Sequence, residues 1–404
     1  MSILRFRGIL AVAICAAALP ANAEVLPQTV AEGARMERAN ALPLTSFYTT
    51  PSDLSASKPG ALLRKEVFTG YSLPAGVRAE RILYHSLDSF GHDVASSAVI
   101  LIPNGSPPAG GWPVIAWAHG TSGVARTCAP SLMKDVYYGT DVLAPMVAAG
   151  FAVVATDYHG LGTEGPHQYV NKIAQSNDVI FSIPAARSAE RSLGRKWVVD
   201  GHSQGGMTAW GVAEAEHDRR DPDFAGAVSV AGAVQKNAFF RELTQTPDLG
   251  FYLAFMAAGI NASFPAFAPR DLLSDAALAH YADVSTKGCW YYAYATYRSV
   301  PGNTLLRPGW DKNEYVEKFF DNLQVGSAPL GGPLFVIAGE ADQTVPLKGV
   351  QAAVHNLCRA GQPVTFKSYP GLDHDPVMDN SLPQQLAWIR DRFAGKPLES
   401  SCGT

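Results

Sequence analysis

Short, continuous runs of apolar residues recur along the chain and predict strands buried on both faces. They lie at 113–120, 151–160, 196–201, 224–232 and 333–340, and a last strand is expected at 364–371. Residues 81–88 and 97–103 are predicted to pair as antiparallel strands around a turn at Phe90–Asp93. Helical patterns at 140–149, 178–193, 204–217 and 381–394 alternate with the strands. This alternation predicts an α/β fold, with a mostly parallel, doubly wound sheet and helices on both faces.

One segment interrupts this alternation and predicts an inserted cap. Residues 233–332 separate two strands that should be neighbours, and they are rich in aromatic side chains, among them Phe239 and Phe240. A structureless loop of that length is rare, so we expect a mostly helical cap over the carboxyl edge of the sheet. The core then comprises 76–232 and 333–404, and 24–75 forms an N-terminal wrap with few regular elements.

The first 23 residues have the pattern of a cleaved signal peptide. Arg5 and Arg7 precede an apolar run of about a dozen residues, and Ala21 and Ala23 provide the small side chains of a cleavage site after Ala23. The apolar run is too short to span a bilayer comfortably. We therefore expect a secreted protein, extracellular or periplasmic, with no transmembrane segment after signal removal.

Charge and cysteine content fit an exported globular protein. Loss of the signal peptide removes two arginines and changes the formal net charge from −4 to −6, with no basic run, so we expect no nucleic-acid partner. Four cysteines remain in an oxidising compartment, and they allow three disulfide connectivities. Position along the chain favours Cys128–Cys289 and Cys358–Cys402. No cysteine or histidine spacing suggests zinc.

The strand at 196–201 runs directly into the helical pattern at 204–217, with Ser203 at the junction between Gly201 and Gly205. A G-x-S-x-G motif on a sharp strand-to-helix turn is typical of a nucleophilic serine. Glycine at both flanking positions avoids collisions with neighbouring backbone, and the helix N-terminus offers free N–H groups. The alternative is a serine that only caps the helix beginning at Gln204. The flanking strand and helix favour the nucleophile.

A nucleophilic serine needs a base and an acid that orients the base. Asp342 follows the strand at 333–340 and is favoured as the acid over Glu340, which falls on the last strand residue. His374 follows the last strand and is the favoured base. The run Asp373-His374-Asp375 could instead hold a metal ion, but it supplies too few oxygen ligands for a hard cation.

The tetrahedral intermediate of acyl transfer needs hydrogen-bond donors for its oxyanion. One expected donor is the backbone N–H of Gln204, directly after the nucleophile. The second is expected from the loop after the strand at 113–120, at Gly120 or Thr121, although a plain turn is the alternative there. Asp157, at the end of another strand, is interpreted as a structural carboxylate.

Five segments in this order resemble the secretory lipase family of α/β-hydrolases, which includes the yeast lipase A type and bacterial secreted lipases and esterases. They are WAHGTSG…CAPS, VVATDYHGLG, GHSQGG, GEADQTVP and DHD, within a span from Trp112 to Arg390. The resemblance implies an α/β-hydrolase fold with a helical cap, and carboxylic-ester substrates. Carried over residue by residue, it gives a triad of Ser203, Asp342 and His374 and an oxyanion hole of Gln204 with Gly120 or Thr121.

These features predict a secreted serine hydrolase that cleaves small-molecule or lipid esters through an acyl-enzyme, without cofactor or metal. A serine exopeptidase on the same fold is one alternative. A second is an esterase of acylated cell-wall polysaccharide, and a third is a non-catalytic glycan binder that uses the aromatic run at 289–294. Acyl-chain length, alcohol moiety and oligomeric state do not follow from the sequence.

Overall fold

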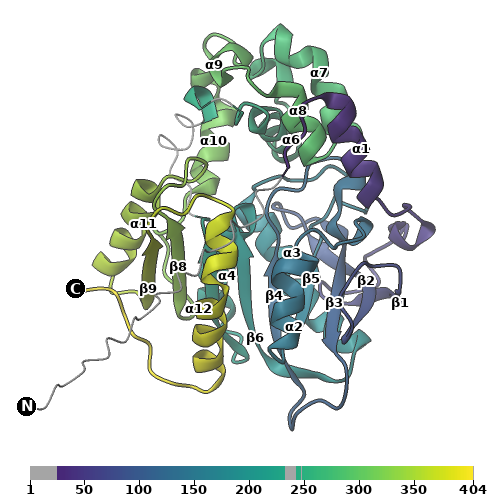
Figure 1. The fold of residues 1–404 in the computed structure, drawn as a ribbon, viewed down its shortest axis with the longest axis vertical. Coiled ribbons are helices and arrows are strands. Elements are labelled where there is room, and N and C mark those ends of the chain that lie inside the picture. Colours follow the sequence, from purple (N-terminus) through teal and green to yellow (C-terminus); the bar gives the residue numbers. More distant parts are fainter. Residues whose placement is uncertain (1–24, 233–242, 247, 404) are drawn as a thin grey trace, which may run out of the picture.

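A computed structural model describes residues 25–232, 243–246 and 248–403 (Figure 1). The predicted signal peptide lies outside the described residues, as do Phe239 and Phe240 of the predicted cap.

Within this part of the chain, nine strands form one sheet in the order β1-β2-β3-β5-β4-β6-β7-β8-β9. Their bounds are β1 (Leu62–Val67), β2 (Val77–Leu87), β3 (Asp93–Pro103), β4 (Trp112–Ala118), β5 (Ala152–Thr156), β6 (Leu193–His202), β7 (Phe224–Val230), β8 (Leu334–Gly339) and β9 (Val364–Tyr369). The pairs β1–β2, β2–β3 and β3–β5 are antiparallel. The pairs β4–β5, β4–β6, β6–β7, β7–β8 and β8–β9 are parallel. The sheet is therefore mostly parallel, as predicted.

Helices cover both faces of this sheet. Helices α3 (Lys172–Ala189), α4 (Gln204–Arg219) and α11 (Leu347–Arg359) share one apolar cluster with alternate strand residues such as Val199 and Val336. Helices α2 (Ala144–Ala148) and α12 (Pro376–Phe393) share the other cluster with Val198 and Ile337. Successive strand residues point to opposite faces of the sheet. Because helices cover both faces, the residues that point to either face must be apolar, which explains the continuous apolar runs.

The described helices between β7 and β8 lie above the carboxyl ends of the parallel strands (Figure 1). They are α6 (Tyr252–Ser263), α7 (Asp275–Thr286), α8 (Trp290–Tyr297), α9 (Gly302–Leu305) and α10 (Glu314–Leu323), with short 3-10 helices at Pro269–Asp271 and Trp310–Lys312. Phe251, Phe255 and Phe267 are fully buried among them. We call these helices the cap; the limits of the cap domain at 233 and 332 stay a prediction.

The N-terminal segment is more regular than the sequence suggested. Helix α1 (Val30–Asn40) packs on α8, and β1 adds an edge strand to the sheet. Thr29 caps α1 by accepting a hydrogen bond from the N–H of Glu32, and Glu37 accepts hydrogen bonds from the N–H groups of Cys289 and Tyr292. Tertiary contacts with the cap thus stabilise a short, polar helix within this segment.

Some helix bounds also differ from the prediction. The predicted helix at 140–149 is a π-helical turn at Gly139–Leu143 followed by the short α2. The helix predicted at 178–193 begins earlier, at Lys172, because the Asn171 side chain caps it by accepting a hydrogen bond from the N–H of Ala174. It ends at Ala189, and residue 193 already belongs to β6.

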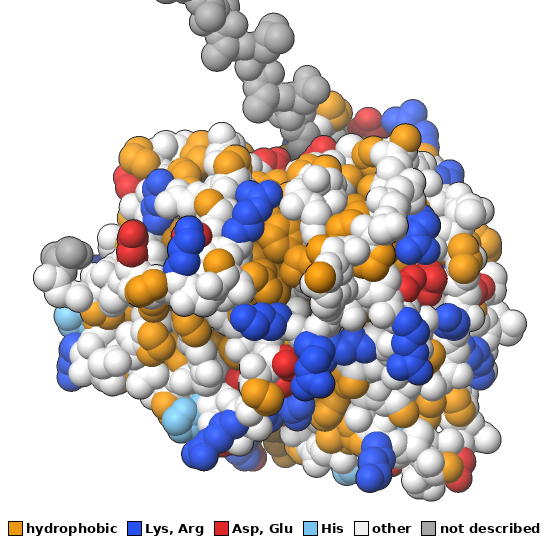
Figure 2. Space-filling view, turned by 90° about the horizontal axis from the view of Figure 1, so that it is seen from below, with side chains coloured by type: hydrophobic (Ala, Val, Ile, Leu, Met, Phe, Trp, Pro, Cys, Tyr) orange, Lys and Arg blue, Asp and Glu red, His pale blue; other side chains and the backbone are white. Residues whose placement is uncertain are grey.

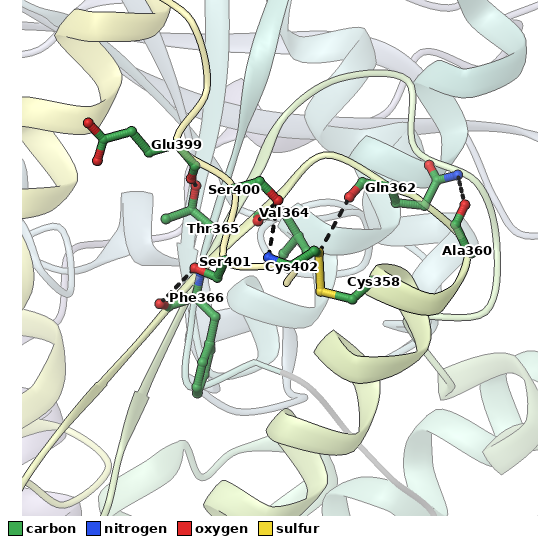
Figure 3. Close-up of a disulfide and its surroundings, with 10 residues drawn as sticks. All are labelled: Cys358, Ala360, Gln362, Val364, Thr365, Phe366, Glu399, Ser400, Ser401 and Cys402. Atoms are coloured by element: carbon green, nitrogen blue, oxygen red, sulfur yellow. Dashed lines mark hydrogen bonds between the residues drawn. A yellow bond between two sulfur atoms is a disulfide. The ribbon is translucent and has the colours of Figure 1, made fainter. Parts of the chain in front are cut away.

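Both predicted disulfides are present. Cys128–Cys289 connects the loop after β4 to the start of the cap helix α8, and Cys358–Cys402 connects α11 to the C-terminal tail. The tail runs beside β9, where the N–H of Ser401 donates to the carbonyl of Val364 (Figure 3). One disulfide thus joins cap and core, and the other fixes the end of the chain.

The end of the molecule away from the cap carries hydrophobic side chains in its middle, with Lys and Arg side chains spaced around them (Figure 2). No helix among the described residues is long and apolar enough to cross a membrane.

Candidate active site

Ser203 lies on a strained turn between the end of β6 and the start of α4. Its backbone has φ 58° and ψ −119°, a conformation that costs energy for any residue with a side chain. A Cβ at Gly205 would lie 1.8 Å from the carbonyl oxygen of Ala118, and one at Gly201 would lie 2.3 Å from that of Gly205. The turn therefore requires glycine at both positions, as the motif indicates.

The turn presents the Ser203 hydroxyl to a histidine from far along the chain. Ser203 Oγ lies 2.8 Å from Nε2 of His374, in the loop between β9 and α12. His374 Nδ1 lies 2.8 Å from Oδ2 of Asp342, in the turn after β8. The other carboxylate oxygen of Asp342 accepts hydrogen bonds from the N–H groups of Thr344 and Val345, at 2.8 and 2.7 Å. The structure thus places the three predicted triad residues in one hydrogen-bonded chain.

Glu340, the alternative acid, points elsewhere. It is exposed and accepts a hydrogen bond from the hydroxyl of Ser368. The strand β8 ends at Gly339, one residue earlier than the sequence suggested, and the turn beyond it directs Asp342 toward His374.

Burial and neighbouring charge shift the pKa of His374 in opposite directions. Burial alone would lower the pKa of His374, but the negative charge of Asp342 and the hydrogen bond to it raise this pKa to about 9. Asp342 therefore holds the proton on Nδ1 and leaves Nε2 to accept the proton of the Ser203 hydroxyl.

His202 forms a hydrogen bond to the backbone of His374. It is buried, and burial together with the nearby charge of His374 lowers the pKa of His202 well below its ordinary value. In its neutral form, Nε2–H donates to the carbonyl oxygen of His374 at 3.0 Å. Nothing local in the sequence indicates this role, because the partner lies 172 positions later.

The two expected oxyanion donors lie beside Ser203. Gln204 is the first residue of α4, so its N–H has no acceptor within the helix. Thr121 and Gln204 line a pocket together with Ser203, and Gly120 is not among the described residues that line it. The carbonyl of Gly120 accepts a hydrogen bond from the His119 ring. We therefore take the N–H of Thr121, which lines the pocket, as the candidate second donor.

The same pocket is closed by residues of the core and of the cap. Besides Ser203 and the two donor residues, its lining comprises Tyr169, Val170, Met207, Tyr252, Thr344 and Val345. Apolar side chains and tyrosine rings thus surround the reacting hydroxyl, and Tyr252 brings the cap helix α6 to the site.

A family model named "Secretory lipase" matches residues 130–401. The chain belongs to the secretory lipase family. Among curated relatives, Lipase 4 of Candida albicans is 25% identical over 390 residues, covering 88% of this chain and 82% of the relative. A Mycobacterium tuberculosis protein named "Probable inactive lipase MT1628" is 24% identical over 383 residues, covering 87% and 82%.

Solved structures with the same fold include lipases and esterases. Candida antarctica lipase A in its closed state aligns with a TM-score of 0.75 at 20% identity, covering 90% of both chains. The rice cell wall degrading esterase LipA from Xanthomonas oryzae aligns with a TM-score of 0.69 at 18% identity, covering 84% of this chain and 100% of that one. These likenesses identify the α/β-hydrolase fold with an inserted cap.

The carboxylates flanking the base in this secretory lipase do not form a convincing cation site. His202, His374 and the exposed Asp375 offer ligand atoms within 4.8 Å of one another. Both ring nitrogens of His374, however, already bind Asp342 and Ser203. A metal ion here would have to break the hydrogen-bonded chain, so the geometry favours a base over a ligand.

Asp157 has the structural role that the sequence analysis predicts. It is fully buried, and its oxygens accept hydrogen bonds from the Ser97 hydroxyl and from both the N–H and the hydroxyl of Ser131. Asp157 therefore fixes the loop after β4 against β3.

Proposed function

We propose that this secretory lipase hydrolyses carboxylic esters through an acyl-enzyme on Ser203. The observation that carries the proposal is the continuous hydrogen-bonded chain from Ser203 through His374 to Asp342, with 2.8 Å at each link. One relative is named a probable inactive lipase, so membership of the family alone does not establish turnover. In this chain all three side chains are present and in contact.

In the acylation step, Ser203 Oγ attacks the ester carbonyl carbon and its proton moves to Nε2 of His374. Asp342 orients the ring and stabilises the imidazolium. The N–H groups of Gln204 and Thr121 donate to the oxyanion. The tetrahedral intermediate then collapses, the C–O bond to the alcohol breaks, and His374 returns the proton to the leaving oxygen.

In the deacylation step, a water molecule gives a proton to His374 and attacks the acyl carbon. Collapse of the second intermediate releases the carboxylic acid and restores the Ser203 hydroxyl. Every proton transfer uses side chains of this protein, so the proposal requires no cofactor or metal. The Malassezia globosa relative named "Secreted triacylglycerol lipase LIP7" supports lipid esters as the substrate class.

The aromatic run at 289–294 gives no support to a glycan-binding role. Trp290 and Tyr294 stack on each other with ring centroids 5.3 Å apart, and both contact the buried Phe251. These rings form the core of the cap, which is the ordinary use of such residues.

We also propose that residues 1–23 are removed as a signal peptide and that the mature enzyme acts in the periplasm or the medium. The family is named for secretion, and the two disulfides fit an oxidising compartment.

Replacement of the nucleophile tests the proposal. Ser203→Ala should lower the hydrolysis of p-nitrophenyl esters at least about 10³-fold, because the attacking oxygen is lost. The assay uses a series from acetate to palmitate, with aminoacyl anilides beside it to detect a peptidase. Ser182→Ala, at a buried serine that bonds only within α3, is the matched control and should retain activity. Undiminished turnover in Ser203→Ala would refute the proposal.

A further inference from the structure

Thr121 is held at two of its atoms by tyrosines from separate segments. Its carbonyl oxygen accepts a hydrogen bond from the hydroxyl of Tyr137 at 2.5 Å. Its side-chain Oγ1 lies 2.8 Å from the hydroxyl of Tyr169. Thr121 and Tyr169 are both more than nine-tenths buried, at 5% and 3% exposed. The first bond holds the peptide unit between Thr121 and Ser122, and the second holds the Thr121 side chain. Together they restrict rotation about the Cα of Thr121, which also carries its N–H.

Tyr137 reaches Thr121 from a strained backbone. Val136 and Tyr137 are consecutive residues in the left-handed region, with φ 55° and 64°. This region is unfavourable for side-chain-bearing residues, above all for β-branched valine. The side chain of Asp135 accepts from the N–H of Tyr137, and Asn40 of α1 donates to the same oxygen. Such strain persists only where the surroundings enforce it, and it is enriched at functional sites.

Burial raises the pKa of Tyr137 far above its ordinary value, so its hydroxyl keeps the proton that it donates. Its ring packs edge-on against His119 and Tyr138, which limits its freedom to move.

Tyr169, the second tyrosine bonded to Thr121, also contacts the pocket and the cap. Tyr169 is one of the residues that line the pocket with Ser203, and its ring packs edge-on against Phe255 of α6, with centroids 5.9 Å apart. A second cap contact lies next along the loop, where the carbonyl of Ser122 accepts from the N–H of Trp290. The loop that carries the oxyanion donor is thus fixed from the core by Tyr137 and from the cap side by Tyr169.

We infer that Tyr137 and Tyr169 are positioning residues that hold the Thr121 N–H in place for the oxyanion. The inference rests on the proposed function, because a fixed donor matters only if Ser203 forms a tetrahedral intermediate. Neither tyrosine needs to touch the reacting atoms. Both act through Thr121, and their effect should appear in the transition state rather than in ester binding.

Tyrosine-to-phenylalanine variants test the inference, because they remove one oxygen and keep the ring. Tyr137→Phe and Tyr169→Phe should each lower kcat for p-nitrophenyl butyrate about 10-fold or more, with KM within about twofold. This is less than the 10²- to 10³-fold cost of losing an oxyanion donor outright. A trifluoromethyl ketone with the same acyl chain forms a tetrahedral adduct on serine, and its Ki should rise by a factor similar to the fall in kcat.

Two matched controls remove the same hydroxyl elsewhere. Tyr297 donates to the carbonyl of Ala277 within the cap, and Tyr84 bonds to the hydroxyl of Thr156 in the core. Tyr297→Phe and Tyr84→Phe should leave kcat and the inhibitor Ki unchanged within about twofold. Both constants are measured at a temperature where circular dichroism shows each variant folded. A remaining inactive fraction then lowers kcat but leaves the Ki unchanged, so the Ki separates misplacement of the donor from loss of active enzyme.

The outcomes discriminate between the two proposals. A wild-type enzyme that hydrolyses no ester would refute the proposed function. An active wild type in which Tyr137→Phe and Tyr169→Phe match the controls, or lose kcat with an unchanged Ki, would overturn the positioning role and leave the proposed function intact.

Discussion

At the residue scale, the site depends on backbone geometry that only particular side chains permit. Ser203 adopts a positive φ, and glycine at 201 and 205 leaves space that a Cβ would fill at 2.3 and 1.8 Å from carbonyl oxygens. The triad was predictable because the order serine, acid, histidine and its loop positions are encoded locally. The roles of His202, Tyr137 and Tyr169 were not, since each depends on a partner distant in sequence.

The charge of Asp342 predicts the pH dependence of the reaction. His374 must be neutral to accept a proton, and Asp342 raises the pKa of His374 to about 9, so kcat/KM should increase with pH through the neutral range. Asp342→Asn removes that charge. Burial, which lowers the pKa of His374, is then opposed only by the lesser effects of Asp375 and Asp373. The acid limb should therefore move to lower pH. The rate should fall about 10³- to 10⁴-fold, because an amide no longer holds the histidine proton on Nδ1 and Nε2 then cannot accept the serine proton.

Profiles of kcat/KM against pH for the wild type and Asp342→Asn measure this shift. Glu340→Gln is the matched control, since Glu340 is exposed and bonds to Ser368. An acid limb that stays in place or moves to higher pH in Asp342→Asn would contradict the assignment of Asp342.

At the scale of elements, apolar runs predicted the buried strands, because a parallel sheet covered on both faces leaves no polar side to alternate with. Bounds were less predictable where a single capping side chain decides them, as Asn171 does for α3. The same holds for α1, whose polar sequence gives little helical signal and whose partner α8 is more than 200 residues away.

One strand residue departs from this apolar pattern. Asp200 in β6 is fully buried between Trp117 of β4 and Val228 of β7, three positions before the nucleophile. Burial raises the pKa of Asp200 to about 8, and the nearby N–H of Gly201 only partly opposes the shift. Between about pH 4 and 8 the folded protein therefore holds a proton that the unfolded chain releases. Stability from this group falls as pH rises through that window.

Asp200→Asn cannot ionise and should lose this dependence. Thermal unfolding followed by circular dichroism gives the Tm of the variant minus the Tm of the wild type at each pH. This difference should become more positive by about 3 °C or more between pH 4 and pH 8. Asp218→Asn, at an exposed carboxylate of α4, is the control and should show no such trend. A difference that is constant with pH, or that decreases, would show that Asp200 is ionised in the folded state.

At the scale of the whole molecule, the cap and the core are joined at the loop after β4, which carries Thr121. The Cys128–Cys289 disulfide connects this loop to the start of α8, and Glu37 of α1 accepts hydrogen bonds from the same end of α8. The 100-residue interruption of the strand pattern predicted a cap. It could not predict that α1 would pack on it, because no local pattern records a contact between distant segments.

Removal of each disulfide should separate stability from activity. Cys128→Ser/Cys289→Ser and Cys358→Ser/Cys402→Ser should each cost about 2–5 kcal/mol of unfolding free energy, measured by denaturant titration. Only the first pair should also lower kcat at a temperature where both variants are folded, because it connects the cap to the loop that carries Thr121. Equal kcat values for the two variants would contradict this coupling.

Covalent labelling tests the central claim most directly, because a fluorophosphonate reacts only with an activated serine. Intact-mass and peptide analysis of the labelled wild type should find one adduct, on the peptide that contains Ser203. Ser203→Ala should give no adduct, and His374→Ala should react far more slowly. An unlabelled wild type, or an adduct on any other residue, would contradict the account.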